Sequence, residues 1–352
     1  MPGMWRLRLA AVGVLAAVAL LPTATAWGDA DRKVEPRIVG GSTASIAQYP
    51  WQAALVLSPS ESSGDAHDRQ FCGGSLVTTR IVITAAHCVY GMAAGDIDVV
   101  LGRTTLSDSS QGAEFPVQAL SYQANYNHPG LFSGIPPRFD VGYLVLSQPS
   151  GQPRIQIAGP DEAGLWAPGI TEDISGWGCT SEPILIILGC STSDTLRAAH
   201  VPIVDDSTCG SGAVYDGDFD PTTMLCAGNL SGGSDSCNGD SGGPMQAPVA
   251  GGYRLVGITS WGEGCGERNA PGVYTRVAGS AIRPLVGADV CALENANGLG
   301  HEVVIAGATP ADSPCLPVSM KNRPFAKCKR IHNKKKRRRC IKKVRRKLKS
   351  RR

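Results

Sequence analysis

The sequence of 352 residues lacks three patterns that would each define a class of protein. It has no Cys-x-x-Cys pair, which argues against a zinc site. Beyond the N-terminal stretch it has no apolar run of about 18 residues, the length that a membrane-spanning helix requires. Its glycines follow no Gly-X-Y repeat, which excludes collagen. Aromatic residues make up only 6%, but a hydrophobic content of 42% excludes a wholly disordered chain.

Acidic residues are missing from one end of the chain. Residues 321–352 contain 19 of the 34 Lys and Arg residues and no Asp or Glu. The other 15 basic residues are set against all 30 acidic ones, so residues 1–320 have a net charge of −15 although the whole chain has +4. An acidic body and a basic tail therefore need separate explanations.

The N-terminal residues have the organisation of a secretory signal peptide. Arg6 and Arg8 precede an apolar stretch over 9–21, and Ala24-Thr25-Ala26 provides small residues for cleavage after Ala26. The stretch is too short to span about 30 Å of hydrocarbon. We therefore expect residues 1–26 to be removed and the protein to be secreted, a compartment in which its twelve cysteines can form disulfides.

Residues 38–286 consist of short apolar or alternating runs broken by Gly, Pro, Ser and Asp. Such runs predict an all-β barrel or sandwich, as one domain or as a pair of small barrels. Helical spacing is found only near 278–286. Residues 287–320 are predicted to be a linker-like segment, and 321–352 form the basic tail.

Three motifs contain residue types suited to nucleophilic catalysis. His87 lies in Thr84-Ala85-Ala86-His87-Cys88, Asp140 opens the apolar run 141–146, and Ser241 lies in Gly239-Asp240-Ser241-Gly242-Gly243-Pro244. A serine that attacks a carbonyl needs a base within hydrogen-bond reach and a buried carboxylate that orients the base. The surrounding glycines allow a sharp turn with amides available to an oxyanion. Asp98 is an alternative carboxylate, but it follows His87 too closely.

These motifs, in this order, resemble the trypsin-like members of the chymotrypsin family of serine proteases. The resemblance covers residues 38–286 and is more similar to secreted bacterial trypsins than to vertebrate ones, because one cystine typical of the latter is missing. It implies two packed antiparallel β-barrels with a short C-terminal helix, followed here by the basic extension. We expect no cofactor and no metal, and we expect the protein to be a monomer. Further matches are Arg37-Ile38-Val39-Gly40-Gly41, Ile174-Ser175-Gly176-Trp177-Gly178, Ser260-Trp261-Gly262 and Pro271-Gly272-Val273-Tyr274.

The resemblance also implies roles for individual residues. Ser241 would be the nucleophile, His87 the general base and then acid, and Asp140 the buried orienter. The amides of Gly239 and Ser241 would form the oxyanion hole. The implied substrate-binding residues are Asp235, Ser260, Gly262 and Gly272.

Asp235 would lie at the base of the pocket for the residue before the cut bond. A buried unpaired carboxylate is costly until a cation pairs with it, so the expected substrates are polypeptides cut after Arg or Lys. The alternative is that Asp235 is an exposed turn residue.

Activation follows from the same resemblance. Residues 27–37 would be an activation propeptide, and cleavage after Arg37 would release the amino group of Ile38 to pair beside Asp240. Because Arg37 itself suits a trypsin-like enzyme, self-activation is one hypothesis and a second protease is the other.

The family pattern implies three disulfides, Cys72–Cys88, Cys209–Cys226 and Cys237–Cys265. Cys179 and Cys190 fall outside that pattern and are left to pair with each other. The apolar run 184–188 between them either packs against the body or contacts a partner. For the remaining four cysteines, Cys291–Cys315 with Cys328–Cys340 is one of several pairings.

Ile341, Val344 and Leu348 recur at helical spacing within the basic tail. The tail is either a basic amphipathic helix that binds an anionic cell surface or polyanion, or a solvated disordered segment. Two alternatives to a protease remain: an inactive binding protein with the protease fold, and a polyanion-binding protein whose function depends mainly on the tail.

Overall fold

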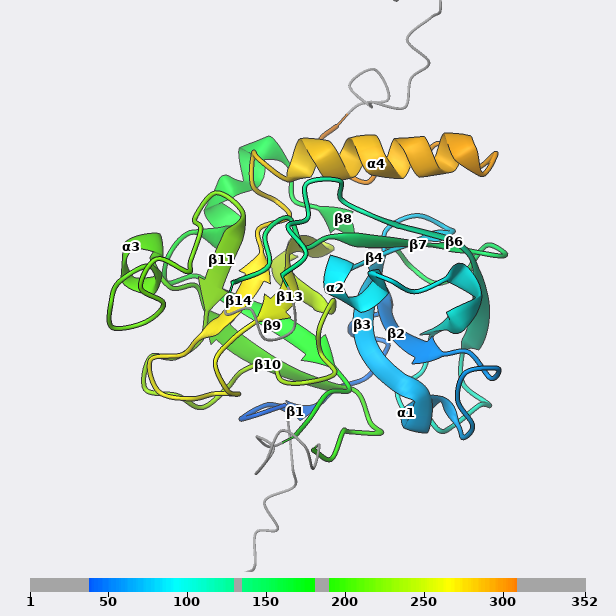
Figure 1. Cartoon of the computed structure of the whole chain (residues 1–352), viewed down its shortest axis with the longest axis horizontal. Coiled ribbons are helices and arrows are strands. Elements are labelled where there is room, and N and C mark those ends of the chain that lie inside the picture. Colours follow the sequence, from blue (N-terminus) through cyan, green and yellow to red (C-terminus); the bar gives the residue numbers. More distant parts are fainter. Residues whose placement is uncertain (1–37, 130–134, 181–189, 309–352) are drawn as a thin grey trace, which may run out of the picture. The chain divides into compact units, whose positions relative to one another are not determined.

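A computed structural model describes residues 38–129, 135–180 and 190–308. The described residues form mostly short strands, with α4 as the one long helix among them (Figure 1). The strands are β1 (Ser42–Thr43), β2 (Gln52–Leu57), β3 (Gln70–Leu76), β4 (Ile81–Thr84), β5 (Ile97–Leu101), β6 (Ala113–Tyr122), β7 (Gly142–Leu146), β8 (Gln156–Ile157), β9 (Thr171–Gly176), β10 (Arg197–Pro202), β11 (Met224–Ala227), β12 (Pro244–Val249), β13 (Gly252–Trp261) and β14 (Gly272–Thr275). The helices are α1 (Ala66–Arg69), α2 (Ala86–Val89), α3 (Asp206–Cys209) and α4 (Arg283–Ala296), with 3-10 turns at Ala94–Asp96 and Pro160–Trp166.

The first half of the described chain closes into a barrel of six antiparallel strands in the order β2-β3-β4-β7-β6-β5. These strands are rich in β-branched and leucine side chains, which suit a pleated and mostly buried surface. Leu55, Ile83 and Leu144 are fully buried inside the molecule. Their burial removes apolar surface from water, which is the main favourable contribution to folding.

The second half, joined by β1 from the start of the described chain, forms a sheet in the order β1-β10-β9-β12-β13-β14-β11, and β8 pairs in parallel with β13. This sheet also curls back on itself. The amide of Val204 donates to Cys226 O (2.8 Å), and the amide of Gly228 donates to Pro202 O (2.9 Å), which joins the end of β10 to β11. The predicted all-β architecture with two packed barrels is therefore confirmed.

Hydrogen bonds connect the two barrels close to the three motifs. Trp51 Nε1 donates to Gln246 Oε1 (2.5 Å), and Ser175 Oγ donates to Gln52 Oε1 (2.6 Å). The amide of Gly73 on β3 donates to the carbonyl of Ser241 (2.7 Å). The barrel that carries His87 and Asp140 is thus held directly against the loop that carries Ser241.

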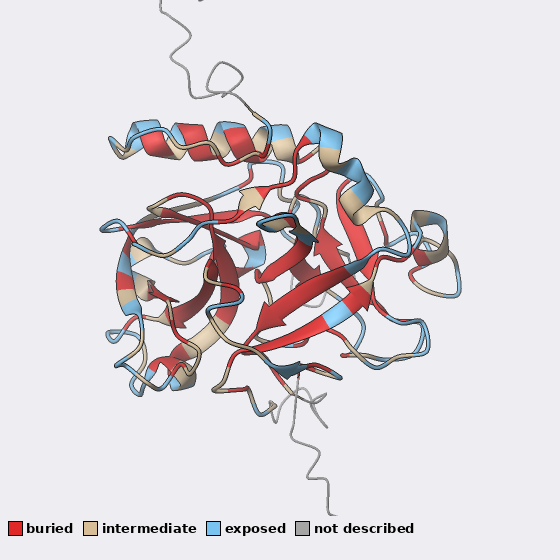
Figure 2. Cartoon of the chain, turned by 180° about the vertical axis from the view of Figure 1, so that it is seen from behind, coloured by how far each residue is buried: buried red, intermediate tan, exposed pale blue. Residues whose placement is uncertain are grey.

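The C-terminal helix is longer than the sequence indicated. The prediction of a linker-like segment from 287 is wrong for its first part, because α4 continues to Ala296. Val286, Val290 and Glu294 are buried at intervals of four residues, which places them on one face of the helix. Figure 2 shows this buried stripe along α4. Hydrophobic spacing alone missed it because the buried face includes a glutamate.

The residues after α4 return to the second barrel. Ile305 forms a parallel bridge with Ile157, and the amide of Ala306 donates to Ile157 O (2.9 Å). The carboxylate of Glu302 accepts hydrogen bonds from the amide (2.9 Å) and the hydroxyl (2.5 Å) of Thr79. Residues 297–308 therefore belong to the folded body and are not a linker.

Several expectations lie outside the described residues: the signal peptide over 1–26, the propeptide over 27–37, the apolar run 184–188 and the basic tail. Cys291 is buried, but Cys315, its expected partner, lies outside the described residues, as do Cys328 and Cys340. In the three described ranges no helix has the length and apolar character needed to cross a bilayer.

Candidate active site

His87 and Asp140 meet at one end of the first barrel. His87 lies on α2, and Asp140 lies two residues before the start of β7. Nδ1 of His87 lies 2.8 Å from Oδ2 of Asp140, and the His87 amide donates to Oδ1 (2.9 Å). The hydroxyl of Ser260 donates to Oδ2 as well (2.6 Å). Three donors therefore hold a carboxylate that is fully buried.

The electrostatics of this pair favour an ionised aspartate beside a basic imidazole. Burial by itself raises the pKa of Asp140, but the charge of His87 and the hydrogen bonds from His87 and Ser260 hold it below its usual value. Burial by itself lowers the pKa of His87, but Asp140 outweighs that effect and raises it above its usual value. The ring nitrogen that faces Asp140 is the one expected to carry a proton, which leaves Nε2 to act as a base.

Ser241 lies in a tight loop that packs against the first barrel. Gly242 has φ +80°, and a Cβ there would lie 2.1 Å from Oγ1 of Thr84, so only glycine fits. Thr84 precedes His87 by three residues, and its hydroxyl donates to Gly73 O (2.7 Å). The close contact of Gly242 with β4 brings the serine loop next to the segment that carries His87.

Two amides of the serine loop point to no acceptor within the described residues. They belong to Gly239 and Ser241, whereas the amides of Asp240, Gly242 and Gly243 donate to backbone carbonyls. Gly239 has φ +92°, a conformation in which other residues are strained. Amides arranged in this way can donate to a developing oxyanion.

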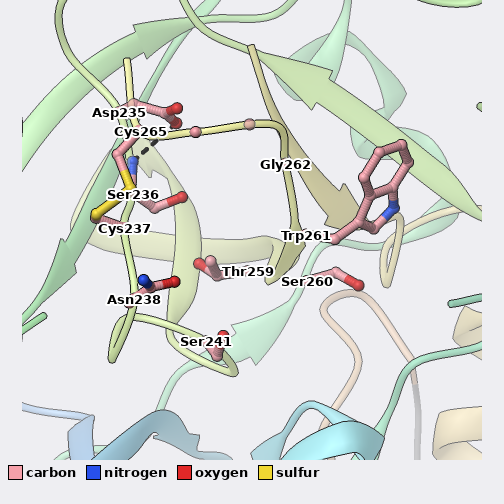
Figure 3. A pocket seen from close by; sticks show the side chains of 12 residues that line it. Asp235, Ser236, Cys237, Asn238, Ser241, Thr259, Ser260, Trp261, Gly262 and Cys265 are labelled. Carbon is pink, nitrogen blue, oxygen red and sulfur yellow. Dashed lines mark hydrogen bonds between the residues drawn. A yellow bond between two sulfur atoms is a disulfide. The ribbon is translucent and has the colours of Figure 1, made fainter. Parts of the chain in front are cut away.

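A cavity of about 160 Å³ begins at Ser241 and has Asp235 at its other end (Figure 3). Gly262 and Gly272 line it together with Ser260 and Trp261. A Cβ on Gly272 would lie 2.6 Å from Oδ1 of Asp235, so a side chain there would block the carboxylate. The cavity therefore connects Ser241 with the Asp235 carboxylate.

Asp235 is buried, with 3% of its surface exposed. Its Oδ1 accepts from the amide of Ser236 (2.8 Å) and its Oδ2 from the amide of Gly266 (3.0 Å). Burial raises the pKa of Asp235 to about 7, against the opposing effect of these amides. The carboxylate lacks a cationic partner among the described residues. Because Asp235 is buried, the alternative interpretation as an exposed turn residue is wrong.

The segment that begins at Ile38 packs beside this pocket. Ile38 is 1% exposed, and the carbonyl of Val39 accepts from the amide of Asp235 (3.0 Å). Asp240 is buried and accepts from the amides of Gly178 (2.8 Å) and Cys237 (3.0 Å). Burial raises the pKa of Asp240 to about 6 despite these two amides.

The described residues contain four disulfides, in the pairs that the sequence analysis expected: Cys72–Cys88, Cys179–Cys190, Cys209–Cys226 and Cys237–Cys265. Cys72–Cys88 joins β3 to the helix that carries His87. Cys237–Cys265 lies in the pocket wall and packs with Cys179. These two links reduce the freedom of the segments that position His87 and the pocket.

Asp98, the alternative carboxylate, and the other histidines of the chain have different partners. Asp98 is on β5 beside Glu114 and Arg69, and burial raises its pKa to about 6. His200 and His301 pair with Asp173 and Glu294, respectively. His67 contacts Thr192, His128 stacks on Tyr90, and His332 lies outside the described residues.

Two groups of metal-ligand types occur in the described part of the chain. One consists of His87 with Cys72 and Cys88, but those two sulfur atoms are joined to each other. The other consists of Asp65, His67 and Asp68, in which the carboxylates cap α1. Neither group supports a metal site.

Two residues of the site escaped the sequence analysis. Gln70 donates through Nε2 to the carbonyl of Gly239 (2.8 Å), and the hydroxyl of Thr275 donates to the carbonyl of Asp140 (3.0 Å). Neither belongs to a motif, and each acts across more than a hundred residues of sequence. The position of Gln70 two residues before Cys72 was the only signal in the sequence.

A buried aspartate and a histidine beside a serine loop with two available amides define a serine peptidase site on two β-barrels. The chain belongs to the trypsin family, whose model matches residues 38–283. It is therefore a trypsin-like serine endopeptidase, a hydrolase that acts on protein substrates.

The chain is similar to proteins from distant organisms. It is 40% identical over 241 residues to "Trypsin" of Saccharopolyspora erythraea, which covers 68% of this chain and 93% of that protein. It is 35% identical to human "Transmembrane protease serine 5" and 37% identical to mouse "Hepatocyte growth factor activator serine protease". In both cases the match covers 70% of this chain, but only 50% and 36% of the relative, respectively.

Proposed function

We propose that the protein is a secreted endopeptidase that cuts polypeptides after Arg or Lys. The observation that carries the proposal is a buried carboxylate, Asp235, with no cationic partner among the described residues, at the far end of the cavity that begins at Ser241. A guanidinium can meet the carboxylate through paired hydrogen bonds, and the shorter lysine through water. The bare backbone at Gly262 and Gly272 leaves room for the long side chain.

In the proposed mechanism Ser241 Oγ attacks the carbonyl carbon while His87 takes its proton. The raised pKa of His87 supports this role, since a more basic imidazole accepts the proton more readily. Asp140 orients the ring and stabilises its charged form, and Ser260 holds Asp140. The amides of Gly239 and Ser241 receive the charge that develops on the substrate oxygen.

When this tetrahedral intermediate collapses, the bond to the leaving amine breaks and His87 donates its proton to that amine. The product is an acyl-enzyme on Ser241. Water then attacks the acyl carbon with His87 as base, and the acid product leaves as Ser241 regains its proton. No external oxidant, reductant or cofactor enters these steps.

We also propose that cleavage after Arg37 activates the enzyme. The new ammonium of Ile38 would pair with Asp240. The burial and raised pKa of Asp240 support this pairing, because its ionised form has no cationic partner among the described residues. The buried side chain of Ile38 and the hydrogen bond from the Asp235 amide to the carbonyl of Val39 would connect this activation step to the pocket.

Secretion, removal of residues 1–26 and binding of an anionic surface or polyanion by 321–352 are parts of the same proposal that rest on the sequence alone. Tethering by the tail predicts retention on anionic surfaces that weakens as salt is added. Retention that is unchanged when 321–352 is deleted would contradict it.

The function is tested with protein cut after Arg37 and peptides that place Arg, Lys, Phe or Ala before a reporter. Turnover of the Arg and Lys peptides, lost in Ser241→Ala, is the expected result. Turnover of the Phe peptide instead would keep the mechanism and contradict the role of Asp235. The absence of all turnover with Ile38 as the confirmed N-terminus would favour the binding-protein alternative.

A further inference from the structure

The amide of Gly239 is useful to an oxyanion only while its peptide unit faces the substrate. That unit joins Asn238 to Gly239, and in a trans peptide the N–H points opposite to the C=O. Glycine adopts positive and negative φ with similar ease, so this unit can rotate at lower cost than its neighbours. A rotated unit would present the carbonyl of Asn238, which repels an oxyanion.

Three contacts oppose this rotation, one on the unit itself and two on the adjoining unit between Gly239 and Asp240. The amide of Cys179 donates to the carbonyl of Asn238 (2.8 Å), which leaves the Gly239 N–H pointing away from Cys179. On the other side of Gly239, Nε2 of Gln70 donates to the carbonyl of Gly239 (2.8 Å). The amide of Asp240 completes the restraint by donating to Cys237 O (2.9 Å). Figure 3 shows Asn238 between Cys237 and the serine loop.

The orientation of the Gln70 side chain supports this function. Nε2 serves two carbonyls, those of Gly239 and Cys72 (3.1 Å). The reversed amide would place Oε1 against both carbonyl oxygens, so the donor end must face them. Oε1 is buried and has no hydrogen-bond partner among the described residues. The side chain thus leaves its own acceptor unsatisfied while it holds Gly239.

Gln70 lies at the start of β3 in the first barrel, and Gly239 lies in the serine loop of the second. The contact therefore joins the barrel that carries the catalytic base to the oxyanion donor itself. We propose that Gln70 is a positioning residue that keeps the Gly239 amide directed at the oxyanion. The inference rests on the proposed function, because it requires the Gly239 amide to act as a donor in the reaction.

The variant that tests it is Gln70→Met, which keeps the length of the side chain and removes the donor. The matched control is Gln156→Met. Gln156 lies on β8, far from the serine loop in sequence, and its Nε2 also donates to a backbone carbonyl, that of Val303 (3.3 Å). Three quantities are measured on protein cut after Arg37: kcat and KM on an Arg peptide, the Kd of a small arylamidine, and the Kd of a peptide aldehyde ending in Arg.

The two ligands separate the oxyanion hole from the pocket. The arylamidine pairs only with Asp235. The aldehyde carbon also bonds to Ser241 Oγ, whose proton passes to His87, and the resulting hemiacetal oxygen occupies the oxyanion position. Loss of one ordinary hydrogen bond changes a conformational equilibrium by about five- to tenfold. We expect Gln70→Met to lower kcat and weaken the aldehyde by that factor while KM and the arylamidine Kd stay unchanged.

Equal weakening of both ligands, or a kcat equal to that of Gln156→Met, would overturn the proposal. If Gln70→Met fails to fold, Gln70→Glu replaces it, because its shape is the same but an oxygen then faces the two carbonyls. A larger fall in kcat with intact arylamidine binding is expected for that variant, and an unchanged kcat would refute the role. If the unaltered enzyme cuts neither the Arg nor the Lys peptide, the proposed function fails first and this inference fails with it.

Discussion

Replacing Asp235 with asparagine tests the specificity of the pocket most directly. Both carboxylate oxygens accept backbone amides, from Ser236 and Gly266, so the substitution removes the charge with little change in shape. One end of the new amide would face a backbone N–H with a donor of its own. The variant therefore loses its attraction for a cation and also leaves one donor poorly paired.

The size of the effect follows from the cost of the buried charge. Burial raises the pKa of Asp235 from 3.8 to about 7, a change of about three pH units. Each unit corresponds to about 1.4 kcal/mol, so the empty pocket disfavours the ionised form by about 4 kcal/mol. A substrate cation that pairs with the carboxylate can recover up to this amount. We therefore expect a preference of about 10³ for a cationic over a neutral side chain.

The assay compares kcat/KM for two peptides that differ only in Arg or citrulline before the reporter, because citrulline is a neutral isostere of arginine. The Arg preference should fall from about 10³ to near unity in Asp235→Asn. Glu263→Gln is the control, since Glu263 is an exposed residue next to Gly262 and its charge is screened by solvent. A preference that survives in Asp235→Asn would refute the reasoning.

The same pKa predicts how pH affects binding of an arylamidine. A cation binds the ionised carboxylate, so below pH 7 binding must first remove a proton from Asp235. The Kd of the arylamidine should fall about tenfold per pH unit as pH rises toward 7, and it should level off above pH 7. In Asp235→Asn this dependence should disappear. A Kd that stays constant between pH 5 and 7 in the unaltered protein would contradict a raised pKa.

Three further predictions concern the catalytic pair, the C-terminal helix and one buried carboxyl. Asp140→Asn should lower kcat by about 10⁴, the loss known for the orienting aspartate of this family, because the amide favours the wrong tautomer of His87. It should also lower the pKa of His87 in the pH–rate profile, and an unshifted profile would contradict the pairing. Asp289 lies on α4 and accepts hydrogen bonds from Gln123 Nε2 and Tyr143 Oη. Asp289→Ala removes this acceptor, so it should lower the free energy of unfolding by about 1–3 kcal/mol and leave kcat unchanged. Thermal unfolding and turnover are measured on the same protein, and an unaltered melting temperature would show that these bonds from α4 add no stability. Burial raises the pKa of Glu172 to about 8, so between about pH 4.5 and 8 the folded state holds a proton that the unfolded state has released. Stability therefore falls as pH rises through this range and levels off above it. Glu172→Gln should be more stable than the unaltered protein at pH 9, and equal unfolding curves there would exclude an ionised buried Glu172.

The amino-acid sequence was sufficient to predict the fold class, and it also singled out His87, Asp140 and the serine loop, which the fold brings together. The chemistry requires a serine, a base and a carboxylate, and the glycines of the serine loop are required by its geometry, as Gly242 against Thr84 illustrates. Asp235 was predicted from the family resemblance, because its register relative to Ser241 and Cys237 matches the family pattern. Short alternating runs were enough to indicate strands.

The tertiary structure decided what depends on contacts between distant parts of the chain. Gln70 and Gly239 are 169 positions apart, and Ser260 and Asp140 are 120 apart, so no local pattern reveals that they meet. The full length of α4 could not be predicted from the sequence either, because it also depends on contacts made after folding. Its buried face includes Glu294, and a buried carboxyl is tolerable only because His301 and the amide of Glu302 reach it when the chain folds back. Local residue types determine which chemistry is available, whereas hydrogen bonds between the two barrels determine how the groups that perform it are held.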